Sequence, residues 1–548
     1  MADYFDLGTY QREVTTTSEQ ARLWFTRGLV WTYGFNHEEA VTCFERALAA
    51  DERCALAYWG LAFALGPNYN KPWESFDPED LSATVPRAHA ASRAAIEAAA
   101  QVAAVTPAER ALIQALAARY PSAEPAGDCM AWNDGYADAM RAAYRAHPGD
   151  LDVAVLFADA LMNLAPWELW TPGGQPAGPA TIEAQAVLEA ALAAPGGPAH
   201  PGVLHMYIHL MEMSPRPEAA LPAGDLLRDL VPDAGHLRHM PTHLDVLCGD
   251  YRSVVASNSA AIEADDRYTA ERGGMNFYTL YRAHDYHFKI YGAMFAGQSR
   301  AALEAADQLA AAIPEDLLRV QVPPMADWLE SFVPMKLHVL IRFGRWAQII
   351  DTPLPADPEL YCVTTALTRY AQGVACAALG RLDDAAAHRR AFAAAAERVP
   401  ETRTLFNNTC RDILQVAAAM LDGELAYRAG QHDAAFGHLR RSVELDDGLP
   451  YDEPWGWMQP ARHALGALLL EQGRVTEAEA VYRADLGLDD TLARSAQHPG
   501  NVWSLHGYHE CLTRLGKREQ AGIIAQQLKI AAAYADVPIR SSCFCRQS

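Results

Sequence analysis

The feature that most constrains the fold is a pattern of small and large residues that recurs at fixed offsets. In TRGLVWTYGFNHEEAVTCFERAL, Gly28 is followed by Ala40 after twelve positions, by Phe44 after sixteen and by Ala47 after nineteen. The same offsets start again at three later glycines, Gly373, Gly423 and Gly466. Each unit turns at a Gly, and an acidic residue opens the next segment, as expected between two helices. The pattern predicts antiparallel helix pairs that approach closely at the small residue.

Weaker copies of this pattern occupy the middle of the chain. They lie around LCGDYRSVV and FAGQSRAAL, and in the first of them His243 stands where the clearer units have glycine. A histidine at the closest approach of two helices departs from the pattern and indicates a special role.

These units resemble the tetratricopeptide repeat family, most specifically in the first unit and between about residues 366 and 490. The resemblance implies a right-handed superhelix of antiparallel helix pairs with a concave groove. No strand-like alternation of any length is present, so we predict an all-α, tetratricopeptide-like α-solenoid. The expected segments are an N-terminal extension (1–19), an N-terminal solenoid with a histidine-rich groove (20–310), a C-terminal solenoid (311–537) and a tail (538–548).

Long segments rich in Pro, Gly and Trp interrupt the repeats. Connections of this length are usually functional or disordered, and their aromatic residues argue against disorder. We expect them to pack against the outer helices, and the alternative is that they form lids over a ligand. They include GPNYNKPWESFDPEDL, APWELWTPGGQPAGPA, VQVPPMADW and DDGLPYDEPWGWMQP.

The net charge and the positions of the cysteines limit the classes of binding partner and the cellular compartment that we expect. The net charge of −23 over 548 residues disfavours nucleic acid and anionic membranes as partners. Neither a long apolar run nor a signal-peptide pattern is found, so we expect a cytoplasmic protein. The ten cysteines are scattered apart from Cys543 and Cys545. We expect no disulfide framework and a frayed tail, with a soft-metal site at the tail as the alternative.

Histidines supply the main candidate for chemistry, because eight of the nineteen lie between residues 200 and 287. Most are three or four positions apart, which places two side chains on one helix face. Imidazole is a common ligand of Zn, Cu and Fe. We therefore predict a site for one or two transition metal ions, led by His243 and His287. The full set of predicted ligands is His205, His209, His239, His243, His284, His287 and Glu212.

One pair in this set is less surely helical than its spacing suggests. If Pro241 is the first residue of a helix, His239 lies before that helix and only His243 lies within it. A hydrogen-bonded network of the same histidines without an ion is the competing interpretation.

The standard phosphate-binding, hydrolase and zinc-protease motifs are missing. The middle of the chain offers imidazole, Tyr and Met side chains, which are closer to a small-molecule pocket than to a peptide-binding track, so we favour a metal-dependent enzyme that acts on a small molecule. The ion would act as a Lewis acid, activate water or bind dioxygen. Tyr281 and Tyr286 are the predicted catalytic residues. The predicted substrate contacts are Tyr207, Tyr278, Trp167 and Trp170. The alternative function is a metal-free scaffold that binds a protein or peptide partner in the groove.

Overall fold

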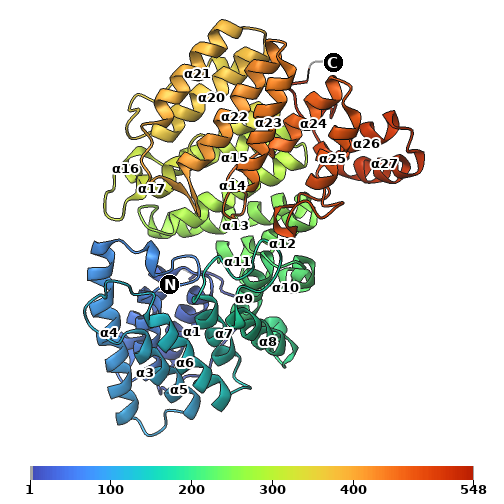
Figure 1. The fold of residues 1–548 in the computed structure, drawn as a ribbon. Coiled ribbons are helices and arrows are strands. Elements are labelled where there is room, and N and C mark those ends of the chain that lie inside the picture. Colours follow the sequence, from blue (N-terminus) through green and yellow to red (C-terminus); the bar gives the residue numbers. More distant parts are fainter. Residues whose placement is uncertain (1–3, 547–548) are drawn as a thin grey trace. The chain divides into compact units, whose positions relative to one another are not determined.

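The chain folds into helical hairpins, as the repeat predicts. In the computed structural model, which describes residues 4–546, the strands among these residues are the two-residue pair β1 (Thr404–Leu405) and β2 (Asn408–Thr409). They form a small antiparallel ladder. The all-α prediction is confirmed (Figure 1).

The chain divides into two compact units. Unit 1 comprises the residues up to 244 together with 260–282, and unit 2 comprises 245–259 together with 283–548. The predicted boundary between residues 310 and 311 lies inside unit 2. The helices of unit 1 are α1 (Glu19–Tyr33), α2 (His37–Ala50), α3 (Ala55–Leu65), α4 (Pro78–Gln101), α5 (Pro107–Arg119), α6 (Trp132–Ala146), α7 (Leu151–Met162), α8 (Pro179–Ala193), α9 (Pro201–Glu212), α10 (Leu221–Leu227) and α11 (Gly235–His239).

Three helices have residues in both units, and the remaining helices belong to unit 2. The three are α12 (Pro241–Cys248), α13 (Tyr251–Arg272) and α14 (Thr279–Phe295). Those of unit 2 are α15 (Ser299–Ala312), α16 (Glu315–Leu318), α17 (Met325–Leu329), α18 (Met335–Arg342), α19 (Trp346–Ile350), α20 (Cys362–Ala378), α21 (Leu382–Ala396), α22 (Cys410–Arg428), α23 (His432–Asp447), α24 (Ala461–Glu471), α25 (Val475–Asp485), α26 (Val502–Arg514) and α27 (Arg518–Ala532).

In the repeats that start at Gly28, Gly423 and Gly466, the small residue lies against the large residue sixteen positions later, whereas Gly373 lies against Leu421 of α22. A methyl group placed on Gly28 would be 2.7 Å from the Phe44 ring, and α1 packs on α2 at this point. The same relationship holds between Gly466 and Tyr482, at 2.5 Å. The pairs α20–α21, α22–α23 and α24–α25 pack in the same way along the chain (Figure 1). This geometry confirms the tetratricopeptide-like hairpins that the offsets predict.

The turns inside these hairpins use a left-handed glycine. Gly380, Gly430 and Gly473 have φ angles of 75°, 76° and 73°, which glycine adopts without steric cost. In the first repeat the equivalent position, five residues before Ala40, is Phe35, and its φ is 56°. The first hairpin therefore places a bulky residue in a backbone conformation that disfavours one.

The long connections are packed, as expected. Trp73 and Trp457 are buried, and the Trp170 indole N–H donates to the Leu210 carbonyl at 2.7 Å. The N-terminal segment is also packed, because Tyr10 and Arg12 bond to Asp152 of α7. No helix in the part of the chain that the structure describes is both long and apolar enough to cross a membrane.

The expectation of a frayed tail is wrong, and so is the soft-metal alternative for it. Cys543 and Cys545 form a disulfide. Ser542 is buried, where its hydroxyl donates to the His463 carbonyl at 2.7 Å and lies 2.6 Å from the Tyr482 hydroxyl. Unit 2 thus holds this segment by hydrogen bonds that the composition of the tail did not indicate.

Candidate metal centre

Helix α9 supplies the core of the site. His200 caps its N-terminus, accepting from the Val203 N–H at 3.2 Å, and Pro201 is its first residue, as helix starts favour. His205 and His209 follow one turn apart, fully buried, with ring centroids 4.7 Å apart. The two imidazoles therefore lie side by side, as their spacing in the sequence predicts.

Each of these imidazoles is held by its Nδ1 atom. His205 Nδ1 lies 2.6 Å from the Tyr33 carbonyl oxygen, and His209 Nδ1 lies 3.0 Å from Glu212 Oε1. Both oxygens are acceptors, so Nδ1 carries the proton and Nε2 carries the lone pair in each neutral ring. Both Nε2 atoms are buried without a hydrogen-bond partner among the described residues. Metal-ligating histidines are anchored in this way, by a carbonyl or carboxylate on the second nitrogen.

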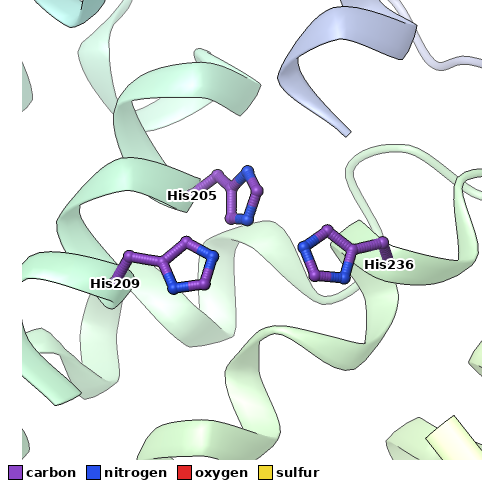
Figure 2. A group of neighbouring side chains, drawn as sticks. All are labelled: His205, His209 and His236. Atoms are coloured by element: carbon purple, nitrogen blue, oxygen red, sulfur yellow. The ribbon is translucent and has the colours of Figure 1, made fainter. Parts of the chain in front are cut away.

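His236 of α11 completes a group of three. One ring nitrogen from each of His205, His209 and His236 lies within 4.8 Å of the other two. Figure 2 shows the three rings around a common space, two from α9 and one from α11. Metal–nitrogen bonds of about 2.0–2.1 Å place ligand nitrogens about 3.4 Å apart in a tetrahedral site. The nitrogens would therefore have to approach one another by at most about 1.4 Å to share one ion.

Burial keeps these imidazoles in the neutral form that can bind a metal. Burial, with the neighbouring ring of His209, holds the pKa of His205 well below its ordinary value. Burial also lowers the pKa of His209, an effect that Glu212 opposes. A neutral imidazole has a lone pair available without first losing a proton.

Glu212 connects this group to the second predicted pair. Its Oε2 lies 2.8 Å from His243 Nδ1, and His243 Nε2 lies 2.8 Å from His239 Nε2. Burial acts to raise the pKa of Glu212, but the imidazoles of His209 and His243 outweigh it and hold this pKa below its ordinary value. His239 is the last residue of α11 and Pro241 the first of α12. Only His243 of this pair thus lies in α12, as the proline indicates.

Aromatic rings enclose the three histidines. The Phe35 ring centroid is 4.5 Å from that of His205, and it stacks on His209 and His236 at 5.7 and 5.5 Å. Trp167 contacts His209 at 5.9 Å. Trp167 also has a positive φ, of 62°. Strained residues of this kind concentrate at functional sites.

The predicted tyrosines take different places. Tyr281 lies against His236, with ring centroids 4.7 Å apart. The Tyr278 hydroxyl donates to Asp265 at 2.9 Å. Tyr207 is buried, and burial, with Glu189, raises its pKa. Tyr281 is therefore the predicted tyrosine in direct ring contact with the group of three, and Trp167 is the predicted tryptophan there.

Three predicted residues belong to unit 2. His284 lies 4.8 Å from the Phe406 ring, and His287 lies 5.3 Å from Phe332. Burial lowers the pKa of His287 to about 3. Tyr286 is buried in the same stretch of α14.

Two residues of the site, His236 and Phe35, are missing from the set that the sequence predicts. His236 lies three positions before His239, and that spacing was the signal for it. Phe35 was detectable as the residue that replaces the turn glycine of the later repeats.

Comparisons with known proteins assign no function to this chain. No family model matches the chain, and no curated protein matches it. Similar solved structures include Ypp1 (9% identity, TM-score 0.41, covering 96% of this chain and 89% of that one). They also include yeast Tom70 (10%, 0.29, 93% and 99%) and the APC/C hetero-tetramer Cut9-Hcn1 (12%, 0.30, 88% and 77%). Likeness at this level carries no argument about function.

Proposed function

We propose that this helical-repeat protein binds a transition metal ion in unit 1 and uses it to act on a small molecule. The observation that carries the proposal is the state of His205 and His209. Both present a buried Nε2 lone pair, and both are fixed in that tautomer through Nδ1. His236 is the third ligand, and Glu212 acts behind His209 as an anchoring carboxylate.

The ligand set favours Zn, Cu or Fe. Imidazole nitrogen suits these metals, and three protein ligands leave a coordination position for a substrate or water. An ion so held would supply a Lewis acid, an activated water or a dioxygen-binding centre. Tyr281, beside His236, is the nearest predicted group for proton donation.

A purely structural hydrogen-bond network explains the cluster less well. Leaving a buried nitrogen without a partner costs about 1–3 kcal/mol. His205 and His209 each leave one such nitrogen. A metal ion would use both lone pairs, so ligation accounts for an arrangement that a network alone leaves unsatisfied.

The alternative function is a metal-free scaffold for a protein partner. Stacked helix pairs create extended binding surfaces. In unit 2, a cavity of about 580 Å³ is lined by Tyr251, Phe295, Ile530 and Tyr534. Ile530 and Tyr534 are exposed, at 67% and 43%. A partner that native protein recovers and that Ile530→Asp and Tyr534→Asp both lose would favour this alternative.

Metal analysis tests the leading proposal. We expect purified protein, reconstituted with Zn(II), Cu(II) or Fe(II), to retain about one ion or more per chain after desalting. His205→Ala combined with His209→Ala should lose it, whereas His438→Ala, an exposed histidine of unit 2, should not. Retention of less than about 0.2 equivalent by native protein would contradict metal binding. Circular dichroism would establish that the variants remain helical.

A further inference from the structure

A cavity of about 340 Å³ lies in unit 1 beside the histidine group. Phe35 and Tyr281 line it, and each also has ring contacts with the histidines. The other lining residues include His37, Lys71 and Tyr278. A volume of this size is in the range of small-molecule sites, and aromatic walls with a few polar groups are typical of them.

Phe35 lies both in the cavity wall and against the histidines, and it does so in an unfavourable backbone conformation. Its ring covers His205, His209 and His236, while the same residue forms part of the cavity wall. The left-handed backbone is unfavourable for an L-residue that carries a side chain. Later hairpins of this chain place glycine at the equivalent turn. In the first hairpin, the turn residue with the strained backbone is thus the same residue that contacts the histidines.

We propose that this cavity binds a small aromatic carboxylic acid, and that Phe35 is the partition between the bound acid and the histidine centre. The ring of the acid would pack among Phe35, Tyr278 and Tyr281, and its carboxylate would meet Lys71. The binding part of the proposal stands without a metal, whereas the partition part rests on the proposed function.

Lys71 is the group of the cavity wall that would meet an anion, in a wall that also carries the acids Glu38 and Asp80. Lys71 Nζ lies 2.6 Å from Asp80 and 4.1 Å from the centroid of the Phe76 ring, and its side chain is mostly buried. An ammonium has three donors, so the contact with Asp80 leaves capacity for a second carboxylate. Arg87 adds a further cation to the wall.

Glu38 is the second acid of the cavity wall, beside Asp80. Its Oε1 accepts from the Phe277 N–H at 3.3 Å. Desolvation raises its pKa, an effect that the charge of Lys71 opposes. His37 stays neutral, because burial, with the charge of Arg119, lowers its pKa to about 3. The cavity therefore offers one mostly buried cation, Lys71, among aromatic rings.

Benzoate and benzylamine test the recognition, because they share a ring and differ in charge. Each is titrated into the full chain after chelator treatment and followed by NMR line broadening of the ligand. We expect benzoate to bind and benzylamine not to bind. Lys71→Gln should weaken benzoate about tenfold or more, since a charge-assisted hydrogen bond is lost. Lys336→Gln, an exposed lysine of unit 2, is the matched control and should leave binding unchanged.

The partition is tested by the rate at which EDTA removes Co(II) from reconstituted protein. Phe35→Gly restores the turn residue of the later repeats, and Phe35→Asn keeps a residue that tolerates this backbone. Both remove the ring, and both should release Co(II) at least about tenfold faster. Phe76→Leu, on the Lys71 side of the cavity, should leave the rate unchanged.

These experiments separate the two proposals. Failure of benzoate to bind, or equal binding of benzylamine, overturns the cavity assignment even if the protein holds a metal. Benzoate binding that depends on Lys71 supports the cavity assignment even if no metal is retained, and in that case the proposed function fails alone. Release of Co(II) at the native rate from both Phe35 variants overturns the partition.

Discussion

Glu212 Oε1 lies 3.0 Å from His209 Nδ1, one turn away on the same helix and fully buried with it. The contact holds the His209 ring through Nδ1 and leaves Nε2 as the nitrogen without a hydrogen-bond partner among the described residues. The pKa of Glu212 is held below its ordinary value by the histidines despite burial, so the anchoring group is a carboxylate. Such an anchor raises the basicity of a metal-ligating imidazole.

Glu212→Gln should therefore weaken metal binding without removing a ligand. We expect the affinity for Zn(II) to fall about 10–100-fold, measured by competition with a chelating dye. Glu168→Gln, at an exposed position of unit 1, is the control. An unchanged affinity in Glu212→Gln would show that this contact does not support the ion.

Close packing at the repeat glycines predicts opposite effects of one substitution at two helical positions. Gly28→Ala would place a methyl group 2.7 Å from the Phe44 ring, whereas a methyl group on Gly135 of α6 meets nothing within 4 Å. We expect Gly28→Ala to lower the free energy of unfolding by about 1–3 kcal/mol through overpacking. Gly135→Ala should raise it by up to about 1 kcal/mol through helix propensity. Urea denaturation of both variants measures the difference, and equal effects would contradict the packing assignment.

The buried side chain of Asp159 leads us to expect a free energy of unfolding that depends on pH. Burial raises its pKa to about 6, against an ordinary value of 3.8. The folded state therefore binds its proton more tightly than the unfolded state, so the stability linked to this group is fully present below about pH 4 and is lost as pH rises through 6. Asp159→Asn mimics the protonated acid and can still accept the hydrogen bond from Asn163.

The variant should match the native free energy of unfolding at pH 4 and exceed it by up to about 3 kcal/mol at pH 8. Asp134→Asn, an exposed acid of unit 1, should show no such trend. A difference between Asp159→Asn and native protein that does not grow from pH 4 to pH 8 would refute the assignment.

The hydrogen bonds of Ser542 lead us to expect that the C-terminal tail stabilises unit 2. Its hydroxyl bonds to the His463 carbonyl and lies within hydrogen-bond distance of the buried Tyr482 hydroxyl. Ser542→Ala removes both contacts and should lower the free energy of unfolding by about 1–3 kcal/mol. Ser541→Ala is the neighbouring control, and thermal unfolding followed by circular dichroism compares the two. A loss no larger than that of the control would mean that the tail does not stabilise this unit.

The hairpin architecture was readable from the sequence because it depends on local relationships. The offset from Gly28 to Phe44, or from Gly466 to Tyr482, is set by the length of two helices and their turn. A small residue must stand where those helices approach. Helix periodicity also placed His205 and His209 on one face of α9. The sequence left open whether a helix starts at Pro241, and in the structure α12 does begin there.

Tertiary structure alone decided which side chains meet. His205, His209 and His236 come from two helices whose relative placement depends on the connection between them, and no spacing in the chain specifies it. The spacing of residues in the sequence also could not show that Phe35 covers all three rings. The sequence showed only that Phe35 stands where the later repeats have a turn glycine. Sequence therefore determined the hairpins and the supply of imidazoles, because those follow from short-range geometry. Long-range packing decided the site, because a ligand set is defined by distances between segments far apart in the chain.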